Sequence, residues 1–286
     1  FKTKRGEITI KAHSYTMLCK CIRPLPEKWH GLKDVEIRYR KRYLDMVANP
    51  QVKDVFIKRF EMIRAMREFL EQQGFIEVET PILQSMYGGA AARPFKSFLH
   101  DLKIDVYLRI SDELYLKRLI VGGFEKVYEI GRVFRNESID RTHNPEFTMM
   151  ECYWAYADYN DMMKMTEQMW EHIAKKVFGK TTFTYQGKTF DLKTPWKRMT
   201  MKEALKTYAK IDVDRLHDHD LQDLLTTHNI EYDGDFTRGL GIQLLFEELV
   251  EDKIVGPVFI LDHPRESTPL CKKKRGDDAL IERFEP

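Results

Sequence analysis

Apolar side chains recur every three or four positions along the stretch that follows Asn49 and Pro50. This spacing predicts an amphipathic helix of about five turns that ends at Gly74. The repeating positions are Phe56, Phe60, Ile63, Met66 and Leu70. Residues 75–80 then alternate between apolar and polar, which predicts a strand. Pro81 ends that strand, because proline has no N–H to give to a sheet.

The same two periodicities predict the elements that follow. Residues 126–135 and 146–156 have strand periodicity and flank a turn-rich loop at 136–144, so we predict an antiparallel hairpin with a long loop. A short helix is predicted between a cap at Ser111 and an end near Gly122 and Gly123. The other predicted elements are strands at 105–110 and 257–262, helices at 159–177, 201–208 and 241–250, and a short hairpin at 182–192 that turns at Gly187.

The N-terminal stretch predicts a domain boundary. Residues 6–18 alternate like a half-buried strand, and little precedes them that could complete a domain. Residues 22–34 carry two prolines and a glycine and predict a linker, before a charged helix from Val35 to Met46. We therefore expect 1–21 to be the last part of one domain, 22–46 a linker and helix, and 47–286 a second domain with a mostly helical insertion at about 178–256. Both ends of the chain are expected to be cut, since it starts at Phe1 and stops at Pro286.

Composition limits the partners of the protein. The 286 residues are 43% apolar, which is enough for a sizeable core. The 47 basic and 45 acidic residues nearly cancel, so any contact with nucleic acid is expected to be local. No run of about 18 apolar residues and no leader pattern is present, so we expect a cytoplasmic protein that does not enter a membrane. The four cysteines lack zinc-ligand spacing and are expected to be reduced: Cys19, Cys21, Cys152 and Cys271.

Candidate chemistry concentrates in residues 131–159. Strand periodicity predicts Arg135 and Glu137 on one face of the first strand, and Phe147, Glu151 and Tyr153 on one face of the second. A guanidinium can bind a phosphate or carboxylate with two parallel hydrogen bonds, and an aromatic ring can stack on a base. The set suits a nucleotide beside an amino acid. The alternative is a surface ion pair beside aromatic rings that only pack the sheet.

Two stretches resemble known sequence motifs. FRNE, a loop and then HNPEF resemble the second signature motif of class II aminoacyl-tRNA synthetases. The helix, strand and proline at 54–83, ending in GFIEVETPIL, resemble the first motif of that class, which builds a dimer interface. Taken alone, this second resemblance is weak, because any helix packed before a strand has the same pattern.

Residues 109–137 closely resemble the lysyl enzymes of the class. The related aspartyl and asparaginyl enzymes carry a glutamine where Glu113 stands. A buried lysine ammonium needs a carboxylate, because an unpaired buried charge costs several kcal/mol. The alternative for Glu113 is a first-turn acid that complements the helix dipole.

The resemblance implies an α+β fold, with an antiparallel sheet flanked by helices and, at 1–21, a remnant of an N-terminal OB barrel that binds the anticodon. It implies ATP-dependent activation of lysine and transfer of the lysyl group to the 3′ end of lysine tRNA, with Mg²⁺, in a homodimer formed through 54–83. Arg135 would be catalytic. The implied ATP-binding residues are Arg135, Glu137, His143, Asn144 and Phe147. The implied lysine-binding residues are Gly89, Glu113, Arg135, Glu151 and Tyr153.

Some features depart from the family pattern. In the family, the third class motif and the carboxylates that hold magnesium come after the position that corresponds to Pro286. This chain alone is therefore expected to be inactive. Phe98, Leu99 and His100 replace a polar loop that contains histidine. The basic run at 272–275 is expected to be a solvated loop, with RNA contact as the alternative. Two other functions stay open, namely a lysyl ligase that modifies a protein and a non-catalytic binding module.

Overall fold

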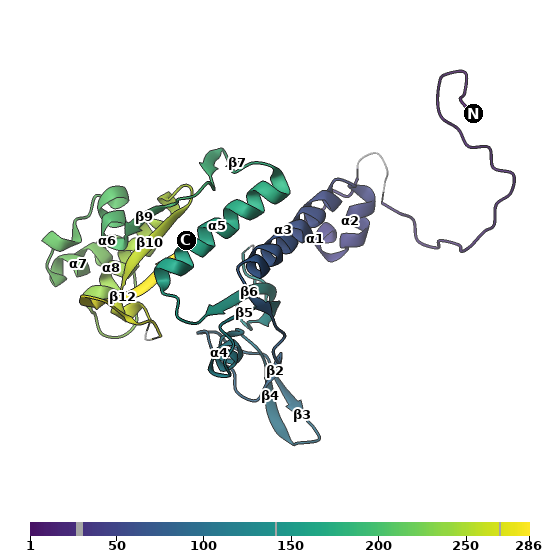
Figure 1. Cartoon of the computed structure of the whole chain (residues 1–286). Helices are drawn as coiled ribbons and strands as arrows, with labels where there is room; N and C mark the ends of the chain where they lie inside the picture. The colour runs from purple at the N-terminus through teal and green to yellow at the C-terminus, as the bar shows by residue number, and fades with distance from the viewer. Residues whose placement is uncertain (27–30, 141, 269) are drawn as a thin grey trace. The chain divides into compact units, whose positions relative to one another are not determined.

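The computed structural model describes residues 1–26, 31–140, 142–268 and 270–286. They form two compact units, Phe1–Phe60 and Glu61–Pro286 (Figure 1). Part of the predicted linker, at 27–30, and position 141 of the predicted loop lie outside the described residues. The domain boundaries expected from the sequence therefore stay a prediction.

The first unit contains the predicted helix at 35–46, which is confirmed but interrupted at Lys41. Asp45 is fully buried here and accepts hydrogen bonds from Arg38 Nε at 2.8 Å and from Asn49 Nδ2 at 2.8 Å. These bonds fix the turn that precedes the long helix. The helices are α1 (Val35–Arg40), α2 (Arg42–Ala48) and α3 (Val52–Gln72), of which α3 begins in this unit.

The strand predicted at 6–18 is wrong. Among the described residues, this stretch forms only an isolated bridge between Lys2 and Ile8. Ile8 is 86% exposed and Ile10 is 91% exposed. An alternating segment becomes a strand only when a neighbour supplies both hydrogen bonds and a face to bury, and none is described for it here. The structure does not confirm a barrel remnant at 1–21.

The second unit is built on a three-stranded sheet of β1 (Ile76–Glu77), β5 (Lys126–Phe134) and β6 (Glu146–Trp154), in the order β1-β5-β6. The predicted antiparallel hairpin of β5 and β6 is confirmed. The expected antiparallel sheet holds for β5 and β6 but not for β1, which runs parallel to β5. The α+β class is confirmed.

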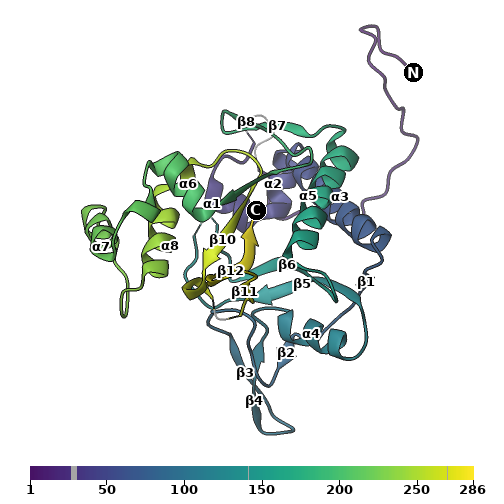
Figure 2. The same ribbon diagram turned by 60° about the vertical axis from the view of Figure 1, so that its left-hand side comes forward.

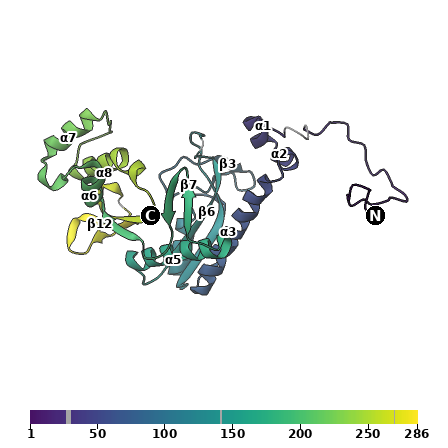
Figure 3. The same cartoon turned by 90° about the horizontal axis from the view of Figure 1, so that it is seen from above.

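One face of this sheet is covered by helices. Tyr128 of β5 packs in a buried cluster with Phe69 and Leu70 of α3 and with Met169 of α5 (Tyr159–Phe178). Because side chains alternate across a strand, Glu129 of β5 and its register partner on β6 point to the opposite face. Figure 3 shows α3 and α5 beside β6 from a second direction. The candidate site lies on the face away from these helices.

A second small sheet and a helix stand on that other face. The predicted strand at 105–110 and the predicted helix after Ser111 are confirmed, although the helix begins at Glu113 and Asp112 is its N-cap. The hairpin of β3 and β4 projects from the rest of the unit in two views (Figures 1 and 2). The elements are β2 (Leu83–Gln84), β3 (Lys96–Leu99), β4 (Ile104–Leu108) and α4 (Glu113–Val121), in the sheet order β2-β4-β3.

A four-stranded sheet and a helical cluster complete the unit. The predicted strand at 257–262, the hairpin at 182–192 and both helices are confirmed, but the helix at 201–208 becomes a π-helix at Leu205–Ala209. The sheet order is β11-β12-β10-β9, with β9 parallel to β10. Its strands are β9 (Lys197–Thr200), β10 (Val258–Pro264), β11 (Lys273–Lys274) and β12 (Asp277–Glu285). The hairpin and helices are β7 (Thr182–Tyr185), β8 (Lys188–Asp191), α6 (Met201–Ala204), α7 (Asp218–Thr227) and α8 (Arg238–Leu249).

The basic run at 272–275 is not a loop throughout, since β11 takes two of its residues. Lys274 Nζ lies 2.6 Å from Asp262 Oδ2, and Arg275 Nε lies 2.5 Å from Glu282 Oε1. Because acids of the same chain neutralise these charges, the structural interpretation of the run is favoured over RNA contact.

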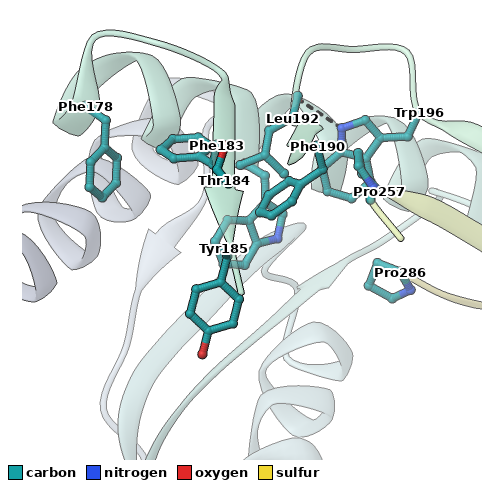
Figure 4. Close-up of a pocket in the computed structure, with 11 residues that line it drawn as sticks. Phe178, Phe183, Thr184, Tyr185, Phe190, Leu192, Trp196, Pro257 and Pro286 are labelled. Carbon is teal, nitrogen blue, oxygen red and sulfur yellow. Dashed lines mark hydrogen bonds between the residues drawn. The ribbon is translucent and has the colours of Figure 1, made fainter. Parts of the chain in front are cut away.

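An apolar cavity of about 640 Å³ lies between the β7–β8 hairpin and the sheet (Figure 4). Phe183 and Phe190 of the hairpin and Trp196 line it, together with Pro257. The Trp196 indole donates a hydrogen bond of 3.0 Å to the Leu192 carbonyl, which fixes one wall. Among the described residues, no Asp, Glu, Lys, Arg or His side chain lines this cavity, and it shares no lining residue with the candidate site below.

Candidate active site

A cavity of about 280 Å³ lies at the loop that joins the end of β5 to the start of β6. All five residues that the resemblance assigned to ATP line it. The lining residues are Arg135, Glu137, Ser138, Thr142, His143, Asn144 and Phe147. The structure thus brings together residues from both sides of the loop, while ATP binding itself stays a prediction.

Arg135 lies between this cavity and the start of α4. Its guanidinium carbon is 5.4 Å from the centroid of the Phe147 ring. Its Nε donates a long hydrogen bond of 3.4 Å to the Ile110 carbonyl. A guanidinium over an aromatic face is held in place by cation–π attraction while its remaining donors stay available. Arg135 therefore has donors to offer to an anion in the cavity.

The expectation that Glu137 shares a strand face with Arg135 is wrong, because β5 ends at Phe134. Glu137 belongs to the loop, and its Oε1 accepts a hydrogen bond of 3.2 Å from the Arg93 N–H. The Asn136 N–H also donates to the Arg93 carbonyl at 2.7 Å. Pairing of the loop with the segment before β3, rather than sheet periodicity, positions Glu137 at the cavity.

His143 is held by an aspartate in the same loop. Asp140 Oδ2 lies 2.8 Å from His143 Nδ1, and Asp140 Oδ1 accepts the backbone N–H of Thr142 and of His143, each at 2.7 Å. These backbone and side-chain hydrogen bonds hold the pKa of Asp140 well below its usual range. The ionised carboxylate thus fixes Nδ1, and the other ring nitrogen, Nε2, takes no part in this contact.

A second cluster surrounds Glu151, near the middle of β6. Glu151 Oε1 accepts hydrogen bonds from Ser111 Oγ at 2.7 Å and from the Asp112 N–H at 3.1 Å. The Tyr153 hydroxyl donates to Glu151 Oε2 at 3.2 Å. Burial and the neighbouring Glu151 and Glu113 carboxylates raise the pKa of Tyr153, so the phenol keeps its proton. Two of the predicted lysine-binding residues are thus in direct contact.

Glu113 and Gly89 adjoin this cluster. A side chain at Gly89 would bring its Cβ within 2.9 Å of both Glu113 Cβ and Ser111 Oγ, and the residue has a φ of +89° that favours glycine. Glu113 Oε1 lies 2.5 Å from Lys117 Nζ, one turn further along α4. That ammonium is also 6.0 Å from the centroid of the Tyr153 ring. The structure thus gathers Gly89, Glu113 and Tyr153 around Ser111 and Glu151. Arg135 reaches the same turn through the Ile110 carbonyl.

Three residues of the site were missed by the sequence reasoning. Arg109, Asp112 and Glu129 are buried beneath the Glu151 cluster, with exposures of 1%, 0% and 5%. Arg109 directly follows β4 and interrupts the apolar run before Ser111, and a charge within such a run is the signal that could have identified it. Burial raises the pKa of Asp112 to about 7, and Glu129 and Glu151 add to this effect while Arg109 opposes it.

Neither a metal site nor a membrane span emerges from the described residues. In that part of the chain no three His, Cys, Asp or Glu side chains gather closely enough to hold a metal ion. No described helix is both long and apolar enough to cross a membrane. The four cysteines are free thiols, and burial raises the pKa of Cys152 to about 12.

The chain, with this hairpin, its cavity and the adjoining carboxylates, matches a known class of enzyme domain. Residues 34–285 match the family model described as tRNA synthetases class II (D, K and N), and the chain belongs to this family. Among similar curated proteins, the lysine–tRNA ligase of Clostridium perfringens strain SM101 is 52% identical over 289 residues, which cover 100% of this chain and 58% of that protein. The lysine–tRNA ligase of Clostridium botulinum strain Langeland is 54% identical and covers 100% of this chain and 57% of that protein. The chain thus spans a little over half the length of these relatives.

Proposed function

We propose that the gene product containing this chain is a lysine–tRNA ligase. The observation that carries the proposal is the position of Arg135, which touches Phe147 in the cavity and the Ile110 carbonyl beside Ser111 and Glu151. One guanidinium can therefore reach both a phosphate in the cavity and the carboxylate of an amino acid whose ammonium group is bound by the Glu151 cluster. The identity with two lysine–tRNA ligases supports lysine as the amino acid.

In the first step, a carboxylate oxygen of lysine attacks the α-phosphorus of ATP, and the bond from that phosphorus to the pyrophosphate oxygen breaks. Arg135 would bridge the α-phosphate and the lysine carboxylate and neutralise the charge that develops between them. Phe147 would stack on adenine, with Glu137 at the adenine end. His143 would face the outer phosphates, and Asn144 would complete the loop wall.

The amino acid would be read by the acidic cluster. Glu151 would bind the α-ammonium, and Glu113 with Tyr153 would bind the side-chain ammonium. Gly89 would offer its backbone to the substrate, because it has no Cβ to obstruct close approach. In the second step, a terminal ribose hydroxyl of tRNA attacks the lysyl carbonyl carbon and AMP leaves.

The proposal includes Mg²⁺ with ATP, but the described residues do not fit a magnesium site of their own. The ion would be held by the nucleotide phosphates and by carboxylates of the family's further sequence, and no step above depends on it. A barrel remnant at 1–21 and a cytoplasmic location belong to the same proposal.

We also propose a homodimer formed through the helix and strand segment at 54–83. Apolar side chains are exposed in each part of it, with Val55 67% and Ile57 52% exposed on α3 in the first unit. In the second unit Ile76 is 52% and Leu83 is 57% exposed. Exposed apolar surface of this kind favours association between protein chains.

The direct test is ATP–pyrophosphate exchange by the full-length gene product with each standard amino acid in turn. We expect exchange with lysine alone, followed by lysyl transfer to tRNA. Exchange with aspartate or asparagine instead would show that lysine is not the substrate. Lysine-dependent exchange with transfer to a protein instead of tRNA would identify a lysyl protein ligase, and no exchange with any amino acid would indicate a binding module.

A further inference from the structure

Arg109 ties together three separate stretches of the chain from a fully buried position. Its Nη1 donates to Glu129 Oε1 at 2.6 Å and to Thr80 Oγ1 at 3.2 Å. Its Nε donates to the Arg132 carbonyl at 2.8 Å. The residue is only 1% exposed, so it does not reach a substrate. It joins the segment after β1, the middle of β5 and the end of β4.

The guanidinium also lies against the turn that holds Glu151. Arg109 Nε is 3.0 Å from Asp112 Oδ1, but its N–H is used by the Arg132 carbonyl. Neither carboxylate oxygen of Asp112 has a hydrogen-bond partner among the described residues. Asp112 therefore receives charge compensation from Arg109 without a hydrogen bond, while its own N–H binds Glu151.

The sheet register adds a second reason for a cation at this position. Glu129 and Glu151 are direct register partners on β5 and β6. Two like charges opposite each other destabilise an antiparallel pair. Here Arg109 binds one of the two carboxylates, and the Ser111–Asp112 turn binds the other.

The backbone of β5 leaves room for this arrangement. A Cβ at Gly131 would lie 2.0 Å from Arg109 Nη2 and 3.2 Å from Glu129 Oε1. Glycine is thus required here by the close approach of the guanidinium. A buried ion pair contributes little net stability compared with apolar side chains of the same volume, so stability alone is a poor reason for this charge cluster.

We propose that Arg109 is a positioning residue for the amino-acid subsite. It fixes the Ser111–Asp112 turn against β5 and thereby sets the position of the Glu151 carboxylate and of Glu113 at the start of α4. The inference rests on the proposed function, since it assigns these acids to the two ammonium groups of lysine.

The test uses two substitutions that disturb the cluster differently, in the full-length gene product. Arg109→Lys keeps the charge but lacks the planar guanidinium fork, whose separate nitrogens reach Glu129 and the Arg132 carbonyl at the same time. Gly131→Ala keeps Arg109 and displaces its guanidinium. We expect each to raise KM for lysine about tenfold or more, and to raise KM for ATP by no more than about twofold. Melting temperatures are measured in parallel.

Arg198→Lys is the matched control, because Arg198 also pairs with a buried glutamate, at 2.7 Å from Glu167, but away from the site. It should leave both KM values unchanged. If Arg109→Lys fails to fold, Gly131→Ala and Glu129→Gln still test the inference. Suppose that the wild-type enzyme is active and the variants fold. An unchanged lysine KM in these variants, or an equal rise in the KM values for lysine and ATP, would then overturn the inference about Arg109. A wild-type enzyme without lysine-dependent exchange would overturn the proposed function, and this inference with it.

Discussion

Ser111 Oγ donates a 2.7 Å hydrogen bond to Glu151 Oε1, across 40 positions of sequence. The same oxygen accepts the N–H of Glu113, the first residue of α4, at 3.1 Å. One hydroxyl therefore connects a helix start to the middle of a strand. The carboxylate proposed to bind the α-ammonium is oriented before any substrate arrives.

Ser111→Ala should weaken lysine binding. A hydrogen bond to a charged group contributes about 1.5–3 kcal/mol, and the Asp112 N–H remains on Glu151, so we expect KM for lysine to rise about tenfold. KM for ATP should stay unchanged. The measurement is pyrophosphate exchange by the full-length gene product, with Ser97→Ala on β3 as the control. A normal lysine KM would show that Glu151 does not depend on Ser111.

Arg135→Ala should lower lysine activation by about a hundredfold or more, comparable to the loss of one preorganised donor at a developing charge. The fold should survive, because Arg135 is only half-buried and its side-chain hydrogen bond to the Ile110 carbonyl, at 3.4 Å, is long. Arg132→Ala, three residues earlier in β5, is the matched control, since Arg132 is exposed and pairs at 3.6 Å with Glu146. Equal exchange rates for the two variants would reassign Arg135 to the surface.

Glu113→Gln should raise KM for lysine and leave KM for ATP unchanged. Breaking one partner of a buried ion pair costs roughly 3–5 kcal/mol, and a second acid in the site would halve the effect. If Glu113 instead only complements the helix dipole, the variant should lose about 0.3–1 kcal/mol of stability with a normal lysine KM. Both KM values and the melting temperature separate these outcomes.

Lys117→Met should lower KM for lysine. The Lys117 ammonium pairs with the Glu113 carboxylate at 2.5 Å, so a substrate ammonium would have to displace it. Glu171 and Lys175 on α5 form an equivalent pair, also at 2.5 Å, and Lys175→Met is the control that should not alter lysine KM. A raised lysine KM in Lys117→Met would mean that Lys117 orients Glu113 instead of competing for it.

Asp112→Asn should change how stability depends on pH. The pKa of Asp112 in the folded chain is about 7, above its ordinary value of 3.8, so the folded state holds a proton that the unfolded state releases between these values. The stability from this proton is present below about pH 4 and is lost as the pH rises through 7. Asparagine does not titrate, so the stability of the variant relative to wild type should rise between about pH 5 and pH 8.

Urea unfolding midpoints of the 286-residue chain at the two pH values give the measurement. Asp101→Asn, at an exposed turn, is the control for loss of one aspartate. A constant difference between Asp112→Asn and wild type at both pH values would mean that Asp112 is ionised throughout.

The sequence by itself determined the elements whose signal is local. The helical repeat ending at Gly74 and the β5–β6 hairpin appear where the periodicity placed them, because each buries one face defined by its own residues. The order of residues around 131–159 also indicated the family to which the chain belongs. The residues that line the cavity beside Arg135 could be grouped from sequence for the same reason, since the hairpin and its loop hold them within one short stretch.

Only the tertiary structure decided which features depend on a distant partner. The alternation at 6–18 resembles that of β5, yet without a described neighbour it stays exposed. Arg109 is an ordinary charged residue in the sequence, and its hydrogen bonds go to Thr80, Glu129 and the Arg132 carbonyl, which lie 20 or more positions away. Periodicity reports which face a residue occupies, whereas the packing of separate segments sets the charge, the burial and the hydrogen-bond partners that it meets there.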